Sequence, residues 1–494
     1  MPGGLDSHAA LCRSCGVIGT ELLLLLLLSL AQLAVLLRAL LRRHRDPATR
    51  LAWVLVVMVI PVFGMIAYLL LGELRIGARR LNLVQQIARR TPRPSVVEPA
   101  AQLLAGSEYS APFALGRTVN DLPPTVGNSA ELSSDENAAV DAMVADIDSA
   151  RHHVHFLTYI WLDDNNGCKL KDALSRAARR GVDVRALADA LGSRGFIRSN
   201  HWRELEEAGV AVREALPVGN LLWTMIRGRV DLRNHRKLLI VDNDTGWCGS
   251  QNAADPEFRI KAKYAPWVDI MTRWKGPVVR ELQYLFVIDW LAESDQNLDY
   301  LLSERPLPDT DGTIIAQVIG TGPALSIPLM SAVFCELIYS ARRTLTITTP
   351  YFVPDENLLF ALVSAARRGV ETTLVVPQRN DSRIVAAASR SHYRDLVEAG
   401  VTICEFRPGL LHAKTMVVDE SVALIGSANL DRRSFELNFE ANVLFMDSEF
   451  VRQLGVRQQS YIAQSAVVGP DEIADTGHLR HAWYNFMAMI GPLL

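Results

Sequence analysis

The chain has 494 residues, of which 49% are hydrophobic, and its 51 Lys and Arg nearly balance its 54 Asp and Glu, which gives a formal net charge of -3. This length permits a large buried core and about three domain-sized units. Near-neutral charge argues against a surface that is basic throughout and binds nucleic acid, although it is compatible with a local basic patch. The mean hydropathy of +0.12 is high for a soluble enzyme with 21% charged residues, so apolar residues must be concentrated in part of the chain.

Two apolar segments lie near the N-terminus, at residues 17–37 and 51–71. The first carries Glu21 near one end, and the second is 21 residues long without a charge. A helix of that length, rising 1.5 Å per residue, crosses a hydrocarbon core of about 30 Å, and Pro61 and Gly64 are tolerated in membrane helices. A cleaved signal peptide is the alternative for the first segment. The second segment, so soon after it, favours a retained transmembrane helical hairpin over residues 17–71.

The orientation of this hairpin is indicated only weakly. Five arginines lie between the two apolar segments and seven on their outer flanks, which leans toward a cytoplasmic body by the positive-inside rule. Six cysteines without a disulfide-like framework lean the same way. Cys12 and Cys15 form a C-x-x-C without a second pair at zinc spacing, and their role stays open. We expect a multi-pass membrane protein whose main body faces the cytoplasm.

Residues 72–133 are expected to be a connector. They are rich in arginine and then in proline, with Gly and Ser between, so the stretch is not expected to form a core of its own, although parts of it could lie along the body. After it, apolar strands alternate with helical runs, which predicts an α/β fold.

The body contains an internal repeat. SARHHVHFLTYIWLDDNN from Ser149 matches SARRTLTITTPYFVPDEN from Ser340, and HWRELEEAGV from His201 matches HYRDLVEAGV from His392. Each copy predicts alternating helices and strands, and the first copy has 14 extra residues, which include the apolar LLWTMI. Two copies predict two domains, at residues 134–305 and 306–494, that form a pseudo-dimer with a shared site at their interface.

The same motif, H-x-K-x4-D-x6-G-S-x-N, follows each copy of the repeat. Its side chains in the first half are His235, Lys237, Asp242, Ser250 and Asn252, and in the second half His412, Lys414, Asp419, Ser427 and Asn429. The segments HRKLLIV and HAKTMVV predict strands, on which each His and its Lys project to the same side. Lysine, serine and asparagine donate hydrogen bonds to phosphate, and histidine can act as nucleophile or acid/base near neutral pH. Two such sets facing each other would place two imidazoles on opposite sides of one phosphoryl group.

A single H-x-K on a strand is usually a surface pair, but two copies with identical spacing on a repeated scaffold favour a catalytic site. The two aspartates are less certain. Asp242 and Asp419 each either orient a catalytic base, or balance a lysine and end a strand. Cys248 lies in an apolar run and is expected to belong to the core.

These strings resemble the double HKD motif of the phospholipase D superfamily and, with the N-terminal hairpin, they resemble bacterial cardiolipin synthases of the two-span type. The resemblance extends through ADPEFRIKAKYAPWVD after the first motif and DRRSFELNFE after the second. It implies two phospholipase D-like α/β/α domains and a phosphohistidine intermediate. By analogy His235 is the nucleophile and His412 the acid/base, although the motifs do not distinguish the two roles. The lysines, serines and asparagines of both motifs would hold the phosphate oxygens, with no cofactor and no metal.

The resemblance also implies a reaction, in which a phosphatidyl group passes from one phosphatidylglycerol to a hydroxyl of another and glycerol is released. The partners would be phosphatidylglycerol and other lipids of a bacterial inner membrane, and not nucleic acid. The preferred acceptor and the oligomeric state are not indicated. The apolar residues 221–226 and 482–494 either enter the membrane interface or pack in the core. The alternatives are a phospholipase D acting on phospholipids with water or another alcohol, a phosphodiesterase acting on nucleic acid, and a non-enzymatic scaffold.

Overall fold

The computed structural model describes residues 6–41, 47–72, 78–94, 100–217, 232–303, 311–323, 329–474 and 477–490. The chain divides into two compact units. The N-terminal unit consists of Met1–Arg75 with Leu221–Arg229, and the main unit consists of Ile76–Asn220 with Val230–Leu494.

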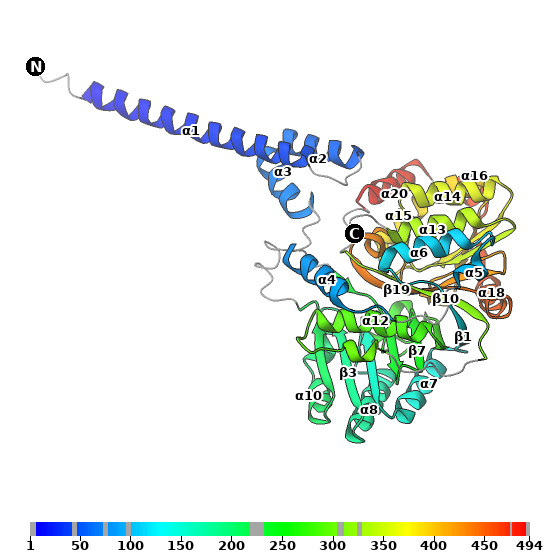
Figure 1. Cartoon of the computed structure of the whole chain (residues 1–494). Helices are drawn as coiled ribbons and strands as arrows, with labels where there is room; N and C mark the ends of the chain where they lie inside the picture. Colours follow the sequence, from blue (N-terminus) through cyan, green and yellow to red (C-terminus); the bar gives the residue numbers. More distant parts are fainter. Residues whose placement is uncertain are drawn as a thin grey trace, which may run out of the picture. The chain divides into compact units, whose positions relative to one another are not determined.

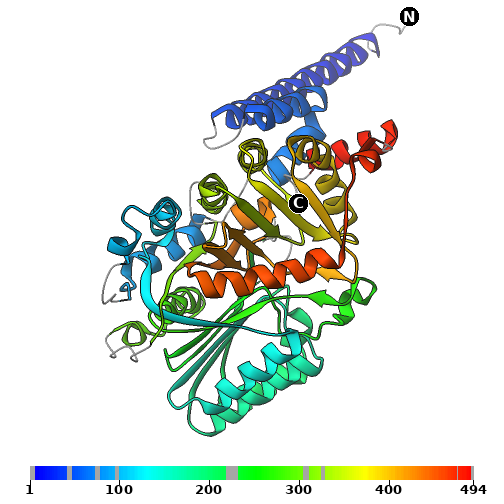
Figure 2. The same cartoon turned by 90° about the vertical axis from the view of Figure 1, so that its right-hand side faces the viewer.

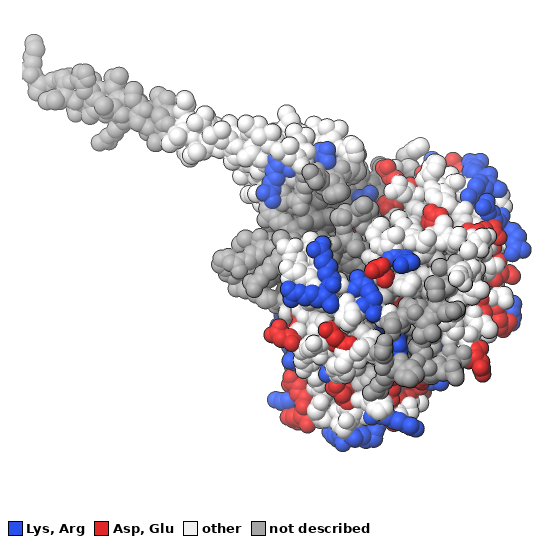
Figure 3. All heavy atoms as spheres, in the orientation of Figure 1, with Lys and Arg blue, Asp and Glu red and all other residues white. Residues whose placement is uncertain are grey.

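One long helix forms most of the N-terminal unit. Helix α1 spans Asp6–Leu41, and its part Glu21–Leu41 is, among the described residues, the one helix long and apolar enough to cross a membrane. Only 6% of that apolar stretch is buried, so its leucines are exposed, and the stretch is white in Figure 3. An exposed apolar stretch of this length is compatible with association with a membrane.

The second apolar segment is broken, which corrects the expectation of one uninterrupted span over residues 51–71. It forms helix α2 (Pro47–Val59), helix α3 (Pro61–Ala67) and a π-helical turn, η1 (Tyr68–Gly72). The break falls at Ile60, because Pro61 has no N–H to continue the helix. At 13 residues, α2 alone is too short to cross a bilayer.

The two segments nevertheless pack against each other. The Gln32 side chain in α1 donates to the Val57 carbonyl at 3.0 Å, and Ala39, Val57 and Tyr68 form a small apolar cluster. The side chains of Cys12 and Cys15 and the apolar residues 221–226 lie outside the described residues, so the expectations for them stay predictions.

The strands and helices of the main unit run in the following order. The strands are β1 (Thr125–Leu132), β2 (His153–Thr158), β3 (Asp183–Asp189), β4 (Ala211–Ala215), β5 (Arg233–Asn234), β6 (Leu238–Val241), β7 (Thr245–Gly249), β8 (Trp267–Val268), β9 (Met271–Lys275), β10 (Ile314–Thr321), β11 (Thr344–Thr348), β12 (Phe352–Val353), β13 (Glu371–Pro377), β14 (Thr402–Phe406), β15 (Leu410–Leu411), β16 (Thr415–Val418), β17 (Val422–Gly426), β18 (Leu430–Asp431), β19 (Asn438–Met446) and β20 (Ser465–Val467). The helices are α4 (Ala78–Arg90), α5 (Ala101–Leu104), α6 (Ser110–Asn120), α7 (Glu136–Ser149), α8 (Asn165–Arg179), α9 (Arg194–Ile197), α10 (Asn200–Glu207), α12 (Val278–Leu291), α13 (Leu329–Ser340), α14 (Glu356–Arg367), α15 (Arg383–Ser391), α16 (Tyr393–Ala399), α17 (Arg432–Glu436), α18 (Ser448–Ala463), α19 (Pro470–Ala474) and α20 (His478–Ile490), with 3-10 turns η2 (Arg259–Tyr264) and η3 (Asp299–Leu301).

The sheet order repeats in the two halves of the main unit. The first half has the order β4-β3-β2-β6-β7-β9-β1 and the second half the order β14-β13-β11-β16-β17-β19-β10, with β20 beyond β14. The halves meet where β1 pairs with β10, antiparallel, in a 16-stranded sheet. This repetition confirms the predicted pseudo-dimer of two α/β domains.

Helices cover the sheet in both halves. In the first half α7 and α8 contact the strands, and these strands lie between that pair and α12 (Figure 1). Helix α18 crosses the second half and also reaches β1 (Figure 2). The chain leaves the repeat helices α10 and α16 through Gly209 and Gly400, where φ values of 95° and 103° favour glycine.

Part of the predicted connector is built into this fold. Strand β1 lies between β9 of the first half and β10 of the second. Helix α6 contributes Phe113 and Val119 to the apolar core of the second half. Residues 100–132 thus join the two halves, because their apolar side chains are buried against strands that are distant in the sequence.

Candidate active site

Each histidine motif begins on a short strand that pairs with the opposite half. Strand β5, just before His235, pairs in parallel with β19, and β15, just before His412, pairs in parallel with β8. The backbone N–H of His235 donates to the Phe439 carbonyl at 2.9 Å, and that of His412 donates to the Val268 carbonyl at 2.7 Å. The motif residues 235–237 and 412–414 precede strands β6 and β16 rather than lying within them, which corrects the predicted strand limits.

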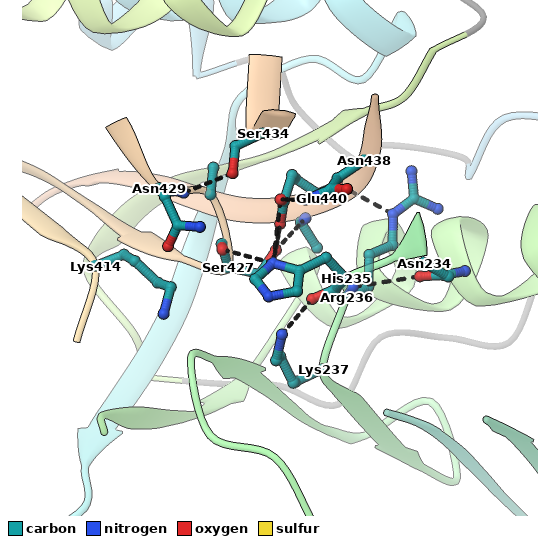
Figure 4. A network of polar contacts seen from close by, with 12 residues as sticks. Asn234, His235, Arg236, Lys237, Lys414, Ser427, Asn429, Ser434, Asn438 and Glu440 are labelled. Carbon is teal, nitrogen blue, oxygen red and sulfur yellow. Dashed lines mark hydrogen bonds and ion pairs between the residues drawn. The ribbon is translucent and has the colours of Figure 1, made fainter. Parts of the chain in front are cut away.

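Each imidazole is held by a carboxylate from the opposite half. The Nδ1 of His235 lies 2.9 Å from Glu440 Oε2, and the Nδ1 of His412 lies 2.6 Å from Asp269 Oδ1. Figure 4 shows the His235 ring turned toward Glu440. A carboxylate accepts the Nδ1 proton, so this arrangement fixes the tautomer in which Nε2 carries the lone pair.

The serines of the two motifs bind these carboxylates. Ser250 Oγ donates to Asp269 at 2.5 Å and accepts from the Ile270 N–H at 3.0 Å. Ser427 Oγ donates to Glu440 at 2.5 Å and accepts from the Ala441 N–H at 2.9 Å. Both serines are fully buried. Each hydroxyl thus already donates and accepts within the protein, which favours a role in holding the carboxylates, and the expected phosphate-binding role of Ser250 and Ser427 stays a prediction.

The two motif lysines are buried beside the histidines. Lys237 Nζ donates to the His235 carbonyl at 2.6 Å, and Lys414 Nζ donates to the His412 carbonyl at 2.5 Å. Burial lowers the pKa of Lys237 to about 8, against the opposing charges of Glu440 and other nearby acids. Burial, with the repulsion of Lys237, lowers the pKa of Lys414 to about 7. An anion near these ammonium groups would raise both pKa values and favour the charged form.

Both histidines are neutral at physiological pH in this environment. Burial lowers the pKa of His235 to about 4, and Lys237 and Lys414 add to this effect against the attraction of Glu440. Burial likewise lowers the pKa of His412 to about 4. Although burial alone would raise them, the pKa values of Asp269 and Glu440 are lowered by the adjacent histidines and lysines, so both carboxylates stay charged.

One pocket of about 420 Å³ opens onto both histidines. Asn252 and Asn429 also line it, with the basic residues Arg233, Lys261, Arg432 and Arg433 and the acidic residues Asp381 and Asp431. Asn252 Oδ1 accepts from the Ile160 N–H at 3.2 Å, and Asn429 Oδ1 is buried without a hydrogen-bond partner. Two imidazoles held through Nδ1, with arginine and asparagine side chains beside them, suit the binding and cleavage of a phosphate ester.

Comparison with known proteins decides the family. A family model described as "Cardiolipin synthase, PLD-like domain" matches residues 143–268 and 334–460, and one described as "Phospholipase_D-nuclease N-terminal" matches residues 30–73. Cardiolipin synthase A of Edwardsiella ictaluri (strain 93-146) is 36% identical over 452 residues, which cover 89% of this chain and 91% of that protein. The chain belongs to the cardiolipin synthase family of phospholipase D-like proteins. The family resemblance predicted from the two motifs is confirmed.

Further relatives agree with this membership. The cardiolipin synthase A of Serratia proteamaculans (strain 568) is 37% identical over 446 residues, which cover 89% of this chain and 91% of that protein. Among solved structures, the phosphatidylserine synthase of Haemophilus influenzae Rd KW20 aligns with a TM-score of 0.58 at 13% identity, covering 78% of this chain and all of that one. At that identity the likeness concerns the fold, and it agrees with two phospholipase D-like domains.

Two residues of this cardiolipin synthase family site were not found from the sequence. Asp269 and Glu440 end the strings KYAPWVD and ELNFE, but they follow Asn252 and Asn429 at different distances, 17 and 11 residues. Because the spacing differs, the sequence does not indicate that Asp269 and Glu440 have the same role in the two halves. The available signal was an acidic residue beside a short apolar strand after each motif.

The motif aspartates lie away from the imidazoles. Asp242 accepts from the backbone N–H groups of residues 151, 152 and 153, each at 2.8 Å. Asp419 accepts from those of residues 342, 343 and 344 at 2.6–2.8 Å. Of the two alternatives for these aspartates, the placement favours the one at a strand end, because both carboxylates bind the chain where β2 and β11 begin.

Proposed function

We propose that this chain is a cardiolipin synthase, which transfers the phosphatidyl group of one phosphatidylglycerol to a hydroxyl of another and yields cardiolipin and glycerol. The main support for the proposal is that two histidines line one pocket. Each of them is held through Nδ1 by a carboxylate of the opposite half. The relatives named cardiolipin synthase A support the choice of lipid substrate.

The first step forms a covalent intermediate. The Nε2 lone pair of His235 attacks phosphorus, and the bond from phosphorus to the glycerol oxygen breaks. His412 gives that oxygen a proton, so glycerol leaves and a phosphatidyl-histidine remains. His412 must be protonated for this step. We expect the anionic phosphodiester to raise its pKa above the value of about 4 in the free protein.

The second step uses the same groups in reverse. A hydroxyl of the second phosphatidylglycerol gives its proton to His412, and its oxygen attacks phosphorus. The bond between phosphorus and His235 breaks, which releases cardiolipin and the free imidazole. The two histidines could exchange these roles, because their surroundings are nearly equivalent.

The lysines and asparagines stabilise the charge that develops on phosphorus. Lys237 and Lys414 are buried and lie beside the histidines, and Asn252 and Asn429 line the pocket. Charged donors in a site shielded from water stabilise a pentacoordinate phosphorane more than they would in bulk solvent. Asp242, Asp419, Ser250 and Ser427 would then be positioning residues.

We place the protein in a bacterial inner membrane as a multi-pass protein with its catalytic body in the cytoplasm. Helix Glu21–Leu41 is long enough to cross, and the broken segment Pro47–Gly72 packs against it through Gln32 and Val57. The broken segment also exposes apolar side chains, including Leu51, Met58 and Phe63. These features support a second crossing that is bent at Pro61.

Product analysis tests the proposed function. The purified full chain is incubated with vesicles of phosphatidylglycerol labelled in its free glycerol headgroup. The proposal predicts equal amounts of cardiolipin and free glycerol. Phosphatidic acid without cardiolipin would instead identify a hydrolytic phospholipase D, and no turnover of lipid with retained His235 and His412 would contradict the enzyme assignment.

A further inference from the structure

The C-terminal helix α20 exposes an apolar stripe to solvent. Leu479, Trp483, Phe486 and Met489 are 90%, 54%, 52% and 77% exposed. Their spacing of four, three and three residues places them along one face of the helix. The opposite face packs against α15, and Figure 1 and Figure 2 show α20, in red, at the margin of the second half. Four large apolar side chains exposed on one helix face mark an interaction surface.

A basic cavity of about 330 Å³ lies at the base of this helix. It is lined by cationic and aromatic side chains from α15, α16 and α20, namely Arg390, Tyr393, Arg394, Arg480, His481 and Tyr484. Glu472 is the acidic residue in its lining. The Glu405 carboxylate binds Arg390 at 2.8 Å and so balances one of the three guanidinium groups. Arg394 and Arg480 are exposed at the cavity and bring a net positive charge to it.

We propose that the apolar stripe and the basic cavity together dock the second half onto an anionic phospholipid leaflet. The stripe would enter the acyl-chain boundary, and the cavity would take the phosphate of a lipid headgroup. Two features indicate that the ligand of this surface is a lipid. Apolar side chains beside arginines match the layered chemistry of an anionic membrane surface, and guanidinium groups bind phosphate in a bidentate manner. This surface is separate from the histidine pocket, so the inference goes beyond the proposed function.

Helix α15 connects the docking surface to the active site. Val385 and the N-cap residue Ser382 line the histidine pocket, whereas Arg390 near the other end of α15 lines the basic cavity. The nine residues of α15 span about 14 Å, at 1.5 Å per residue. Ile260, at the histidine pocket, is 61% exposed. A leaflet docked on α20 would therefore lie a short distance from the opening through which a lipid substrate enters.

Photocrosslinking in nanodiscs tests this inference. The photoreactive amino acid p-benzoylphenylalanine replaces Trp483 in the full chain. As a matched control it replaces Val456, which is 60% exposed on α18. The discs contain phosphatidylcholine with or without phosphatidylglycerol, and crosslinked lipid is measured by mass spectrometry. We expect at least fivefold more lipid on position 483 than on position 456 in discs with phosphatidylglycerol.

Charge variants test the headgroup part of the proposal. Arg394→Gln with Arg480→Gln should lower crosslinking at position 483 at least threefold in discs with phosphatidylglycerol. Arg394→Lys with Arg480→Lys, and the surface control Arg452→Gln on α18, should retain it. Equal yields at positions 483 and 456, a crosslink from 483 to a second copy of the chain, or no response to phosphatidylglycerol would overturn the inference. Since crosslinking requires no turnover, such a failure would leave the proposed cardiolipin synthesis untouched.

Discussion

At the scale of single residues, the decisive contacts are those on the Nδ1 atoms of the two histidines. Each is made by a carboxylate that lies more than 140 residues away in the sequence. Each carboxylate is in turn held by a motif serine. The carboxylates therefore fix the tautomer and orientation of the two rings.

Removal of either carboxylate charge should impair turnover without unfolding the protein. Asp269→Asn and Glu440→Gln keep the size of the side chain but favour the wrong histidine tautomer. We expect kcat to fall by about 10³-fold in each case. Initial rates with phosphatidylglycerol vesicles, compared with the surface variant Glu449→Gln, check this. Rates within tenfold of the unsubstituted chain would contradict the assigned orientation of the rings.

The buried histidines also predict a loss of stability in acid. Their pKa of about 4 lies below the ordinary histidine value of 6.5. Below pH 6.5 the unfolded chain therefore binds protons at these histidines, whereas the folded chain does not. The free energy of unfolding consequently falls as the pH decreases from 6.5 toward 4. Each imidazole should lower the free energy of unfolding by on the order of 1 to 2 kcal/mol between pH 6.5 and pH 5.

Thermal unfolding of the detergent-solubilised chain at several pH values measures this loss. His412→Gln removes one titrating group, so the decrease of Tm between pH 6.5 and pH 5 should become smaller. Substitution of the exposed His478 by Gln is the control and should leave the decrease unchanged. An unaltered decrease in the His412→Gln chain would mean that this imidazole does not resist protonation in the fold.

At the scale of secondary-structure elements, the repeat itself could be predicted from the sequence, because matching strings imply matching strands and helices. The catalytic motifs could be predicted for the same reason. The pairing of β5 with β19 and of β15 with β8 could not, because these two-residue strands have no pattern of their own. Pro61 was visible in the sequence, but a proline is also compatible with a continuous membrane helix, so the break could not be predicted.

The motif aspartates provide a test at this scale. Asp242→Ala removes three hydrogen bonds to the backbone at the start of β2. We expect a loss of about 2 kcal/mol in the free energy of unfolding and less than a tenfold decrease in kcat per folded molecule. Asp242→Asn, which keeps an acceptor, should lose less stability. A 10³-fold decrease in kcat with unchanged stability would instead make Asp242 catalytic.

At the scale of the whole molecule, the two halves form one active site because each supplies the carboxylate that the other requires. The charges on the described face of the main unit are mixed in sign (Figure 3), in agreement with the near-neutral net charge. The cations that matter for chemistry are few and buried, which composition alone could not indicate. Part of the predicted connector turned out to join the halves, since β1 pairs with strands of both.

A shared site predicts strongly non-additive substitutions. His235→Ala and His412→Ala should each reduce turnover to background, and the double variant should be no slower than either single one. Rates measured under identical conditions with phosphatidylglycerol vesicles decide this. If each single variant retained about half of the activity, the two halves would be independent sites.

The covalent intermediate tests the central claim most directly. The full chain is quenched in alkali during turnover of phosphatidylglycerol labelled in its phosphate, and the labelled peptide is sequenced. The account predicts an acid-labile phosphatidyl group on one of the two motif histidines, His235 or His412, and no label when that histidine is replaced by Ala. Label on neither histidine, together with undiminished cardiolipin formation in the His235→Ala and His412→Ala chains, would contradict it.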